Sequence, residues 1–344
     1  MRALVTGAGG FIGGHVVAAL TASGAEVRAF DHRPPIAGVP AEVEFVCGDV
    51  LDPDAVRRAV TGCDTVFHLA AVYSYARGDA ALMRAVNVRG TRTVLDAALR
   101  GKHRRVVHTS SCATCGPARG RPATERDLPE PRELAVPYRR TKLEGERLAL
   151  EAARGGAEVI VVNPTVPVGR GDLRPTPTGK MVADVAHGRA RAYLARSALN
   201  VVAVEDVALG HLLALERGRS GERYLLGGEN MTVREVFAVI ARAAGLSAPR
   251  WPVPWTAAYG VARLADPALR PVGREPQLLV LDEVRTGRRP HVFDDAKART
   301  ELGYVSRPAV DALAEAARSA LATTPDDYET SAIAEQPVPT MPKP

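Results

Sequence analysis

The chain has 344 residues, of which 46% are hydrophobic and 24% charged, and its formal net charge is +6. This composition excludes a wholly disordered, collagen-like or disulfide-rich protein, and the length suits one large α/β domain with an added lobe. Scattered basic residues with only 5% aromatics argue against nucleic-acid binding. Because no apolar run is long enough for a membrane helix and no signal-peptide pattern opens the chain, we expect a cytoplasmic protein that does not enter a membrane.

Short apolar runs alternate with amphipathic ones in the first half of the chain, a pattern typical of a parallel sheet with helical crossovers. The predicted strands cover residues 2–6, 26–30, 43–47, 64–70, 105–110 and 158–163. Apolar residues at helical spacing predict helices over residues 11–23, 53–61, 80–100 and 138–154. Together these elements predict an α/β fold, a doubly wound parallel (Rossmann) sheet.

The pattern changes after Asn163-Pro164 into a proline-rich loop followed by mixed helices and short strands. We expect a dinucleotide-binding domain over residues 1–164, to which residues 195–215 return. Residues 165–322 should mainly form a smaller, mixed α/β substrate lobe that includes the short strand at Tyr224-Leu225-Leu226. Residues 323–344 are rich in proline and poor in large apolar residues, so we expect a disordered tail.

A glycine-rich turn joins the first predicted strand to the first predicted helix. Its glycines, Gly7, Gly10 and Gly13, are spaced three apart, with Phe11 and Ile12 at the start of the helix. Glycines allow a tight turn and a close approach of a pyrophosphate, whose charge then lies at the positive N-terminus of the helix. The strand, turn, helix and second strand therefore predict a dinucleotide site that includes all five residues.

Acidic residues end the second and third predicted strands. Asp31 is placed to accept hydrogen bonds from the ribose hydroxyls of the adenosine and to repel a 2′-phosphate, so the sequence favours NAD over NADP. Arg33 is the contrary signal, because its guanidinium could bind that phosphate. Asp49 and Val50 follow the third strand, where an adenine would lie; an ordinary turn aspartate explains Asp49 equally well.

Tyr138 and Lys142 lie one helical turn apart at the start of a predicted helix, directly after Pro137. A tyrosine acts as a base near neutral pH only if its pKa is lowered, which a neighbouring ammonium, a helix N-terminus and an oxidised nicotinamide all favour. The hydroxyls of Ser110 and Ser111 end the fifth strand, at the sheet edge where such folds bind ligands. This pattern predicts proton transfer at a carbinol or carbonyl group.

The order of these motifs resembles the extended short-chain dehydrogenase/reductase superfamily, of the NAD-dependent epimerase/dehydratase type. Further shared motifs are His68-Leu69-Ala70-Ala71, Asn87-Val88-Arg89-Gly90-Thr91 and Asn163-Pro164. The segments at residues 163–169, 175–179 and 221–228 are most similar to the hopanoid-associated sugar epimerase branch, a neighbour of dihydroflavonol-reductase-like proteins. The resemblance extends from residue 1 to about residue 320.

The resemblance implies a role for individual residues. It makes Tyr138 the general acid/base, Lys142 the residue that holds the nicotinamide ribose, and Ser111 the partner of the reacting oxygen. It also implies that the dinucleotide is lined by Ala70, Ala71 and Pro164, and that the substrate is met or supported by Asn87, Cys112 and Asn163. Helices 80–100 and 138–154 would form the interface of a homodimer.

Two positions depart from the sugar-nucleotide enzymes of the family. Cys115 stands where they commonly carry tyrosine, and Leu199 lies in a segment where they carry an arginine for the diphosphate. Cys112 and Cys115 form a C-x-x-C pair without partners for a zinc site, which favours reduced structural thiols over a redox role. The histidines show no metal-ligand spacing, so we expect no metal.

The sequence therefore predicts an NAD-dependent oxidoreductase that acts on a secondary alcohol or ketone of a sugar-like small molecule. Either epimerisation or net oxidation or reduction fits these residues. Two alternatives stay open: an NADPH-dependent carbonyl reductase of the dihydroflavonol-reductase-like kind, and a non-catalytic dinucleotide sensor. A sensor usually keeps the glycine turn but lacks the Tyr/Lys pair, so Tyr138 and Lys142 count against it.

Overall fold

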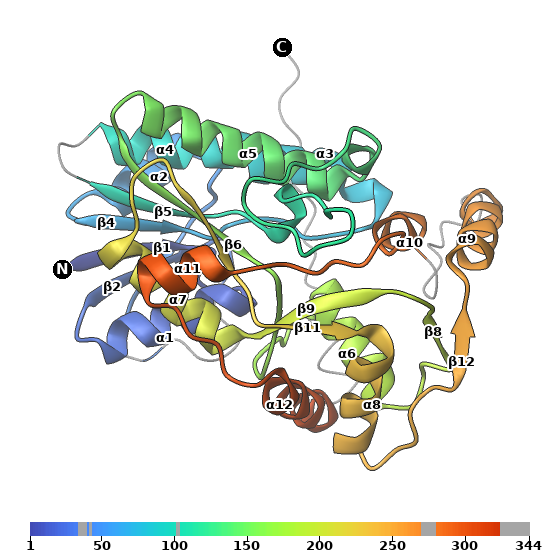
Figure 1. Cartoon of the computed structure of the whole chain (residues 1–344). Coiled ribbons are helices and arrows are strands. Elements are labelled where there is room, and N and C mark those ends of the chain that lie inside the picture. Colours follow the sequence, from blue (N-terminus) through green and yellow to red (C-terminus); the bar gives the residue numbers. More distant parts are fainter. Residues whose placement is uncertain (34–39, 41–42, 101–103, 270–279, 324–344) are drawn as a thin grey trace.

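The structure is a computed structural model, and it describes residues 1–33, 40, 43–100, 104–269 and 280–323 (Figure 1). The tail predicted from residue 323 lies outside the described residues, apart from Thr323 itself. The chain divides into a large parallel sheet covered by helices on both faces and a smaller group of strands and helices beside one end of it.

The large sheet has seven strands, in the order β10-β6-β5-β4-β1-β2-β3, and every neighbouring pair is parallel. Its strands are β1 (Arg2–Thr6), β2 (Glu26–Asp31), β3 (Glu44–Cys47), β4 (Thr65–His68), β5 (Arg105–Thr109), β6 (Glu158–Pro164) and β10 (Arg223–Leu226). The six predicted strands are all present within a few residues of their expected bounds. The order reverses at β1, as in a doubly wound sheet, so the predicted Rossmann fold is confirmed.

Two helical layers bury the faces of this sheet. On one face lie α1 (Phe11–Ala22), α7 (Val204–Arg217) and α11 (Ala296–Leu302); on the other lie α2 (Pro53–Val60), α4 (Thr91–Leu99) and α5 (Pro137–Arg154). Strands such as β4 are buried at every position, because helices cover both of their faces. The two resulting cores are separate clusters of aliphatic side chains, which fix the sheet between the helices.

The predicted helix over residues 80–100 is interrupted in its middle. After η1 (Arg77–Asp79), the chain forms α3 (Ala80–Arg84), a wider π turn, η2 (Ala85–Gly90), and then α4. A Cβ at Gly90 would lie 2.8 Å from Cγ2 of Val50, so the helix needs a glycine to approach the turn after β3 this closely. The wider turn contains Asn87, a residue that the sequence assigned to the site.

The smaller lobe contains two short sheets, β11-β9-β7 and β12-β8. Its strands are β7 (Val166–Val168), β8 (Ala192–Leu194), β9 (Ala198–Ala203), β11 (Glu229–Thr232) and β12 (Trp251–Val253). Its helices are α6 (Pro177–Ala186), α8 (Val233–Ala243), α9 (Trp255–Leu269), α10 (Leu281–Thr286) and α12 (Ala309–Ala322). Helices α6, α8 and α12 share one apolar core with β7 and β9, and α9 and α10 form a second, smaller cluster.

One strand belongs to a different part of the molecule than the sequence predicts. Tyr224, Leu225 and Leu226, expected in the smaller lobe, form β10 and pair in parallel with β6 at the edge of the large sheet. All three side chains are fully buried, and the Tyr224 hydroxyl donates to Glu301 Oε2 at 2.9 Å. A four-residue strand carries no local signal of its partner, which lies 60 residues earlier in the chain. Residues 195–215 are also divided, since β9 joins the lobe while α7 covers the large sheet.

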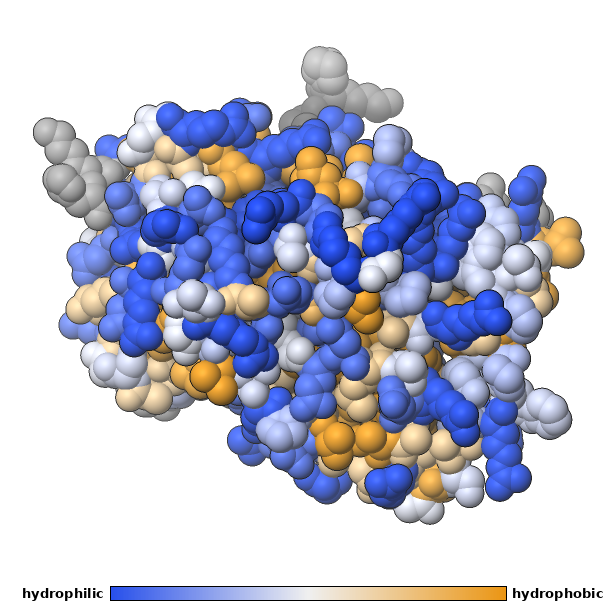
Figure 2. Space-filling model, viewed as in Figure 1, coloured by the Kyte–Doolittle hydropathy of each residue, from blue (hydrophilic) through white to orange (hydrophobic). Residues whose placement is uncertain are grey.

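Polar and charged residues cover most of the face shown in Figure 2, with apolar residues between them in small groups. Within the described ranges, no helix combines the length and the apolar character needed to cross a membrane.

Candidate active site

A cavity of about 2520 Å³ lies between the carboxyl edge of the large sheet and the smaller lobe. It is lined by sixteen of the residues that the sequence assigned to the site: Gly7, Gly10, Phe11, Ile12, Gly13, Asp31, Arg33, Asp49, Val50, Ala70, Ala71, Ser111, Cys112, Tyr138, Lys142 and Pro164. Asn87 and Asn163, the two others, are not among its lining residues. The parallel strands end at this edge, which explains why segments far apart in the sequence converge here.

The glycine turn is packed too tightly for side chains. Gly7 has a φ of +72°, and a Cβ there would lie 2.6 Å from the backbone nitrogen of Ala70. A Cβ at Gly13 would lie 2.0 Å from the Gly7 carbonyl oxygen. The turn therefore brings bare backbone to the cavity wall at the N-terminus of α1, where a helix favours negative charge. This cradle fits the pyrophosphate of a dinucleotide.

Asp31 ends β2 beside the glycine turn and is 8% exposed. Its carboxylate accepts from the backbone nitrogens of Gly9, at 3.0 Å, and Arg33, at 3.3 Å, and pairs with His32 Nδ1 at 3.0 Å. Burial alone raises the pKa of Asp31, but the bonds from His32 and Gly9 lower it overall. A charged carboxylate is thus fixed where the adenosine ribose of a dinucleotide lies in this fold.

Arginine side chains accompany this carboxylate. Arg174 lies on the loop that leads into α6. Its pKa is lowered overall, because burial and the charge of Arg33 outweigh the opposite effect of Asp31. Arg33 and Arg174 both line the cavity. The ribose region therefore holds one acidic and two basic groups within electrostatic range of each other. The sequence offered Arg33 as a phosphate partner but gave no sign that Arg174 would reach the same region.

Ser111, Tyr138 and Lys142 come together at the centre of the cavity. Ser111 follows β5 and caps η3 (Cys112–Thr114), where its Oγ accepts from the Ala113 nitrogen at 3.1 Å. Helix α5 begins at Pro137, which places Tyr138 in its first turn and Lys142 in the next. Tyr138 and Ser111 both line this part of the cavity, and Lys142 Nζ donates to the Thr109 carbonyl at 2.7 Å.

The pKa values at this site differ from the sequence expectation. Burial raises the pKa of Tyr138, and the Ser111 side chain offsets only part of this rise. Burial lowers the pKa of Lys142 to about 8, partly opposed by the charge of Glu146. Lys142 donates its hydrogen bond to the Thr109 backbone carbonyl, and its ammonium does not outweigh the burial of the phenol. The protein's own groups therefore keep Tyr138 protonated, and the lowering that a base needs has to come from a bound cation such as an oxidised nicotinamide.

The two asparagines, which the resemblance assigned to meeting or supporting the substrate, lie behind the cavity wall. Asn87 is 2% exposed; its Oδ1 accepts from the Val72 nitrogen at 2.8 Å, and its Nδ2 lies 3.0 Å from the Val72 carbonyl and 3.1 Å from Thr141 Oγ1. It thereby ties the loop after β4 to α5. Asn163 is completely buried, and its Nδ2 lies 2.7 Å from Glu146 Oε2. The partners of this nitrogen are buried groups, so the amide nitrogen of Asn163 faces a carboxylate and not the cavity.

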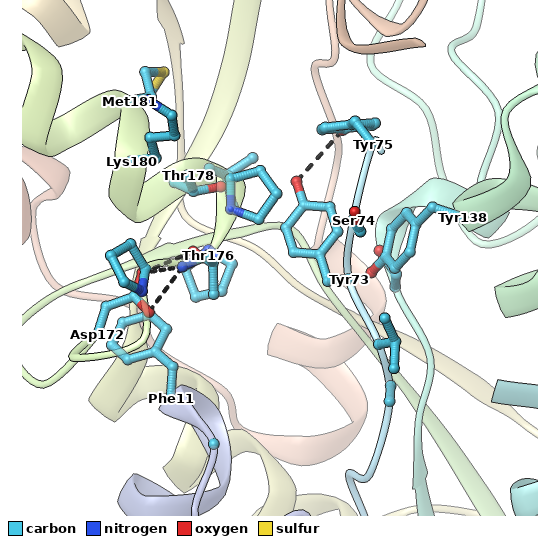
Figure 3. Close-up of a pocket in the computed structure, with 18 of the residues that line it drawn as sticks. Phe11, Tyr73, Ser74, Tyr75, Tyr138, Asp172, Thr176, Thr178, Lys180 and Met181 are labelled. Atoms are coloured by element: carbon cyan, nitrogen blue, oxygen red, sulfur yellow. Dashed lines mark hydrogen bonds between the residues drawn. The ribbon is translucent and has the colours of Figure 1, made fainter. Parts of the chain in front are cut away.

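Two tyrosines that the sequence analysis did not single out stand next to Tyr138. The Tyr73 ring packs against the Tyr138 ring with centroids 4.4 Å apart, and the Tyr73 and Tyr75 hydroxyls are 3.4 Å apart (Figure 3). Burial raises the pKa of both. Their position directly after the predicted strand 64–70 is the signal that could have found them, because that strand ends at the ligand-binding edge.

The lobe side of the cavity is mainly apolar. Its walls carry Met181 from α6, Tyr193 and Leu194 from β8, Val253 from β12, Ala258 from α9 and Val284 from α10. Two half-exposed cations on α6 and the turn after it share one carboxylate: Lys180 Nζ and Arg189 Nε lie 3.3 Å and 2.8 Å from Asp184. Leu199, where the resemblance led us to note a missing arginine, also lines the cavity.

The C-x-x-C pair is part of the packing around the site. Cys112 and Cys115 are both buried free thiols. Burial raises the pKa of Cys112 to about 11 and that of Cys115 further, so neither is a ready thiolate. In the part of the chain that the structure describes, no group of three or more His, Cys, Asp or Glu side chains is arranged to hold a metal ion.

The glycine turn, Ser111, Tyr138 and Lys142 line one cavity of a Rossmann fold, and the fold is that of the extended short-chain dehydrogenases/reductases. The chain belongs to the NAD dependent epimerase/dehydratase family, whose model matches residues 3–227. Such enzymes are NAD(P)-dependent epimerases, dehydratases and reductases, and this chain is an enzyme of that type.

Relatives and solved structures agree with this assignment. The chain is 37% identical over 323 residues to sterol demethylase protein B of Methylococcus capsulatus, covering 92% of this chain and 97% of that protein. It is 33% identical over 317 residues to a 4-hydroxy-2-methyl-3-oxo-4-farnesyl-3,4-dihydroquinoline-1-oxide ketoreductase of Stigmatella aurantiaca, covering 89% and 92%. Among structures, a Thermus thermophilus UDP-glucose 4-epimerase in complex with NAD matches with a TM-score of 0.75 and 25% identity, covering 94% and 100%.

Proposed function

We propose that the protein is an NAD-dependent oxidoreductase that removes hydride from a secondary alcohol, or returns it to a ketone, at Ser111, Tyr138 and Lys142. The observation that carries this proposal is the convergence of these three side chains, from β5 and α5, in the cavity that also holds the glycine turn. The sensor alternative offers no reason for a half-buried Tyr138 that lines the same cavity as Ser111 and a buried Lys142.

Each of the three residues has one task. NAD, when bound along the glycine turn, supplies the hydride acceptor and a positive charge. Tyr138 takes the proton of the substrate hydroxyl as the hydride leaves the adjacent carbon, and Ser111 donates a hydrogen bond to the same oxygen. Lys142 holds the nicotinamide ribose with its ammonium. In the reverse direction, Tyr138 returns the proton to the carbonyl oxygen.

We propose NAD as the preferred cofactor, with NADP as the weaker one. The charged Asp31 beside the ribose region supports NAD because it repels a 2′-phosphate. Asp49 and Val50 would border the adenine, although Asp49 Oδ1 already accepts from the Leu51 nitrogen at 2.9 Å as in an ordinary turn. Ala70, Ala71 and Pro164 would line the remainder of the dinucleotide.

The sugar-like substrate remains our first proposal for the molecule that carries the alcohol, and epimerisation remains slightly favoured over net oxidation or reduction. The epimerase with a similar fold supports this choice. A second candidate, a carbonyl reductase of the dihydroflavonol-reductase-like kind, is favoured by one specific observation. The lobe side of the cavity presents tyrosine and aliphatic side chains. Such side chains suit an apolar substrate, and two relatives are named for the apolar sterol and farnesyl-quinoline compounds.

An isotope experiment tests the reaction. Candidate alcohols carrying deuterium on the carbinol carbon are incubated with the enzyme and NAD, and the deuterium is located by mass spectrometry. Net oxidation transfers it to NADH, whereas epimerisation leaves it on the inverted carbon. If NAD binds but no alcohol in the panel loses its deuterium or is inverted at the deuterated carbon, the oxidoreductase proposal fails and the sensor alternative gains.

We also propose a homodimer in the cytoplasm, built on the face of α3, α4 and α5. These helices pack against each other, and Leu82 on α3 is 44% exposed. Sedimentation velocity of the purified protein tests the dimer. A monomer at micromolar concentration contradicts it.

A further inference from the structure

A cluster of four polar side chains lies behind Ser111, on four different elements. Thr114 of η3, Glu146 of α5 and Asn163 of β6 are at most 1% exposed, and the Arg223 side chain of β10 is 12% exposed. None of the four is among the residues that line the cavity. Removing so many polar groups from water is costly unless each is paired, so their bonds are informative.

The carboxylate of Glu146 is the centre of this cluster. Its Oε2 lies 2.7 Å from both Thr114 Oγ1 and Asn163 Nδ2, and its Oε1 lies 3.1 Å from Arg223 Nε. Arg223 also donates from Nη2 to the Thr114 carbonyl at 3.2 Å. These contacts join α5, η3, β6 and β10 at one buried charge.

The same two donors reach the backbone of Ser111. Thr114 Oγ1 lies 2.8 Å and Asn163 Nδ2 lies 3.1 Å from the Ser111 carbonyl oxygen. The asparagine amide has two protons, so it bonds Glu146 and Ser111 at once, whereas the threonine hydroxyl donates to one of them at a time. Glu146 is therefore connected to the Ser111 backbone through two side chains.

Glu146 also shares the inner face of α5 with the catalytic pair. Tyr138, Lys142 and Glu146 are spaced four residues apart, which places them one above the other along the helix. The other titratable groups that interact electrostatically with Lys142 are His68 of β4 and His108 of β5. Burial lowers the pKa of both histidines, that of His68 to about 3. Both histidines are therefore neutral. In the described chain, Glu146 is the negative charge that raises the pKa of Lys142 against the effect of burial.

We propose that Glu146 is a positioning residue of this active site, which fixes the Ser111 backbone through Asn163 and Thr114 and whose negative charge supports the Lys142 ammonium one turn away. The inference rests on the proposed function for the roles of Ser111 and Lys142. Replacing a buried ion pair with apolar residues of similar volume often leaves the stability of a protein unchanged. Stability does not by itself require the Glu146 charge.

The first test is Glu146→Gln, with Glu151→Gln as the matched control on the exposed side of the same helix. NADH fluorescence titrations across pH measure cofactor binding without any substrate. Because Lys142 holds the ribose as an ammonium, NADH affinity should fall as Lys142 loses its proton. Loss of the Glu146 charge should move that fall down by about one pH unit. The control should keep the wild-type midpoint.

Turnover gives the second readout. With the alcohol identified by the deuterium assay, Glu146→Gln should lower kcat about tenfold through a displaced Ser111 and change KM for NAD less than twofold at pH 6.5, where Lys142 stays charged in both proteins. A wild-type pH midpoint together with a wild-type kcat overturns the inference, whatever the variant's melting temperature.

Two further variants separate the possible failures. Tyr138→Phe tests the proposed function itself: if it keeps its turnover, that proposal fails, while the NADH midpoint still decides the role of Glu146. Thr114→Val removes one bridge to Ser111 and keeps the Glu146–Arg223 pair, so it serves if Glu146→Gln does not fold. It should lower kcat about threefold with an unchanged NADH midpoint; unchanged kcat in a folded Thr114→Val overturns the bridging role.

Discussion

The two halves of the cavity are built on different principles. The cofactor half consists largely of backbone, with Gly7 and Gly13 held in contact and Asp31 bonded to backbone nitrogens of Gly9 and Arg33. The lobe half consists of side chains, among them the apolar Leu194 and Met181, with polar groups such as Lys180 between them. Backbone geometry suits one ligand, whereas apolar side chains accept whatever shape fits.

This difference also concerns distance along the chain. The glycine turn, Asp31 and the loop after β4 lie within the first 76 residues, and each follows a predicted strand. The lobe wall combines α6, β8, β12, α9 and α10, which are spread over a hundred residues. Substitutions in the cofactor half should therefore have large effects on the binding of one ligand. Substitutions in the lobe half should have small effects on binding that depend on the substrate.

The largest expected effect lies where the two halves meet. Tyr138→Phe deletes the proton-transfer group and keeps the ring that packs on Tyr73, so kcat should fall about 10²- to 10⁴-fold while NAD affinity stays within about threefold. Calorimetry with NAD and the deuterium assay measure the two quantities. Tyr259→Phe, on α9 against Trp255, is the matched control and should be neutral. Normal turnover of Tyr138→Phe would assign the base elsewhere.

The next largest effect concerns the packing of the glycine turn. In Gly13→Ala the new methyl would lie 2.0 Å from the Gly7 carbonyl oxygen, so the turn and α1 must separate. Overpacking of this kind costs about 1–3 kcal/mol of stability, and the displaced turn no longer matches the pyrophosphate, so NAD affinity should fall about fivefold or more. Gly14→Ala is the control, because its methyl meets only the Ala8 carbonyl oxygen at 3.8 Å. Equal NAD affinity for both variants would show that the turn does not depend on this contact.

Asp31 provides a smaller and more selective test of the cofactor half. Asp31→Ala removes the acceptor for the ribose hydroxyls and leaves Arg33 and Arg174 nearby. A lost charge-assisted hydrogen bond corresponds to about 1.5–3 kcal/mol, so NAD affinity should fall about tenfold or more while NADP affinity rises. Isothermal titration with both cofactors gives the ratio. Adding Arg33→Ala should abolish the gain for NADP; if it does not, Arg174 is the better partner for a phosphate.

The sequence could predict that the residues around the glycine turn converge, because the signals there are local. Strand, turn and helix follow one another around Gly7, and sixteen assigned residues line one cavity. Its errors came from contacts between distant segments. Nothing near Asn163 indicates that a glutamate on α5 and an arginine on β10 will surround its amide, and nothing near Tyr224 indicates that its strand joins β6.

The chemistry at Tyr138 could be predicted only in part, for a related reason. The spacing of Tyr138 and Lys142 on one helix face follows from the sequence, whereas the burial that raises the pKa of the phenol depends on the walls of the whole cavity. The neighbouring ring of Tyr73 is part of those walls. Local spacing can therefore predict which groups meet, and only tertiary packing decides their protonation.

The smallest expected effect distinguishes the two substrate classes in the lobe half. Met181 of α6 lines the cavity beside Thr178 and Lys180 (Figure 3). Met181→Gln keeps the length of the side chain and replaces its thioether with an amide. For an apolar ketone, KM should rise about three- to tenfold, since burying a side chain of this size against an apolar ligand contributes about 1 kcal/mol or somewhat more. For a sugar-like substrate, whose hydroxyls can bond to the amide, KM should stay the same or fall. NAD affinity should not change in either case, because Met181 lies on the lobe and not on the glycine turn.

Leu246→Gln, at a 43% exposed position outside the cavity lining, controls for the general effect of replacing an apolar side chain with glutamine. Measuring KM for both kinds of substrate with both variants decides between the classes, and a rise for the sugar-like compound alone would show that Met181 contacts it in a way that its apolar surroundings do not explain.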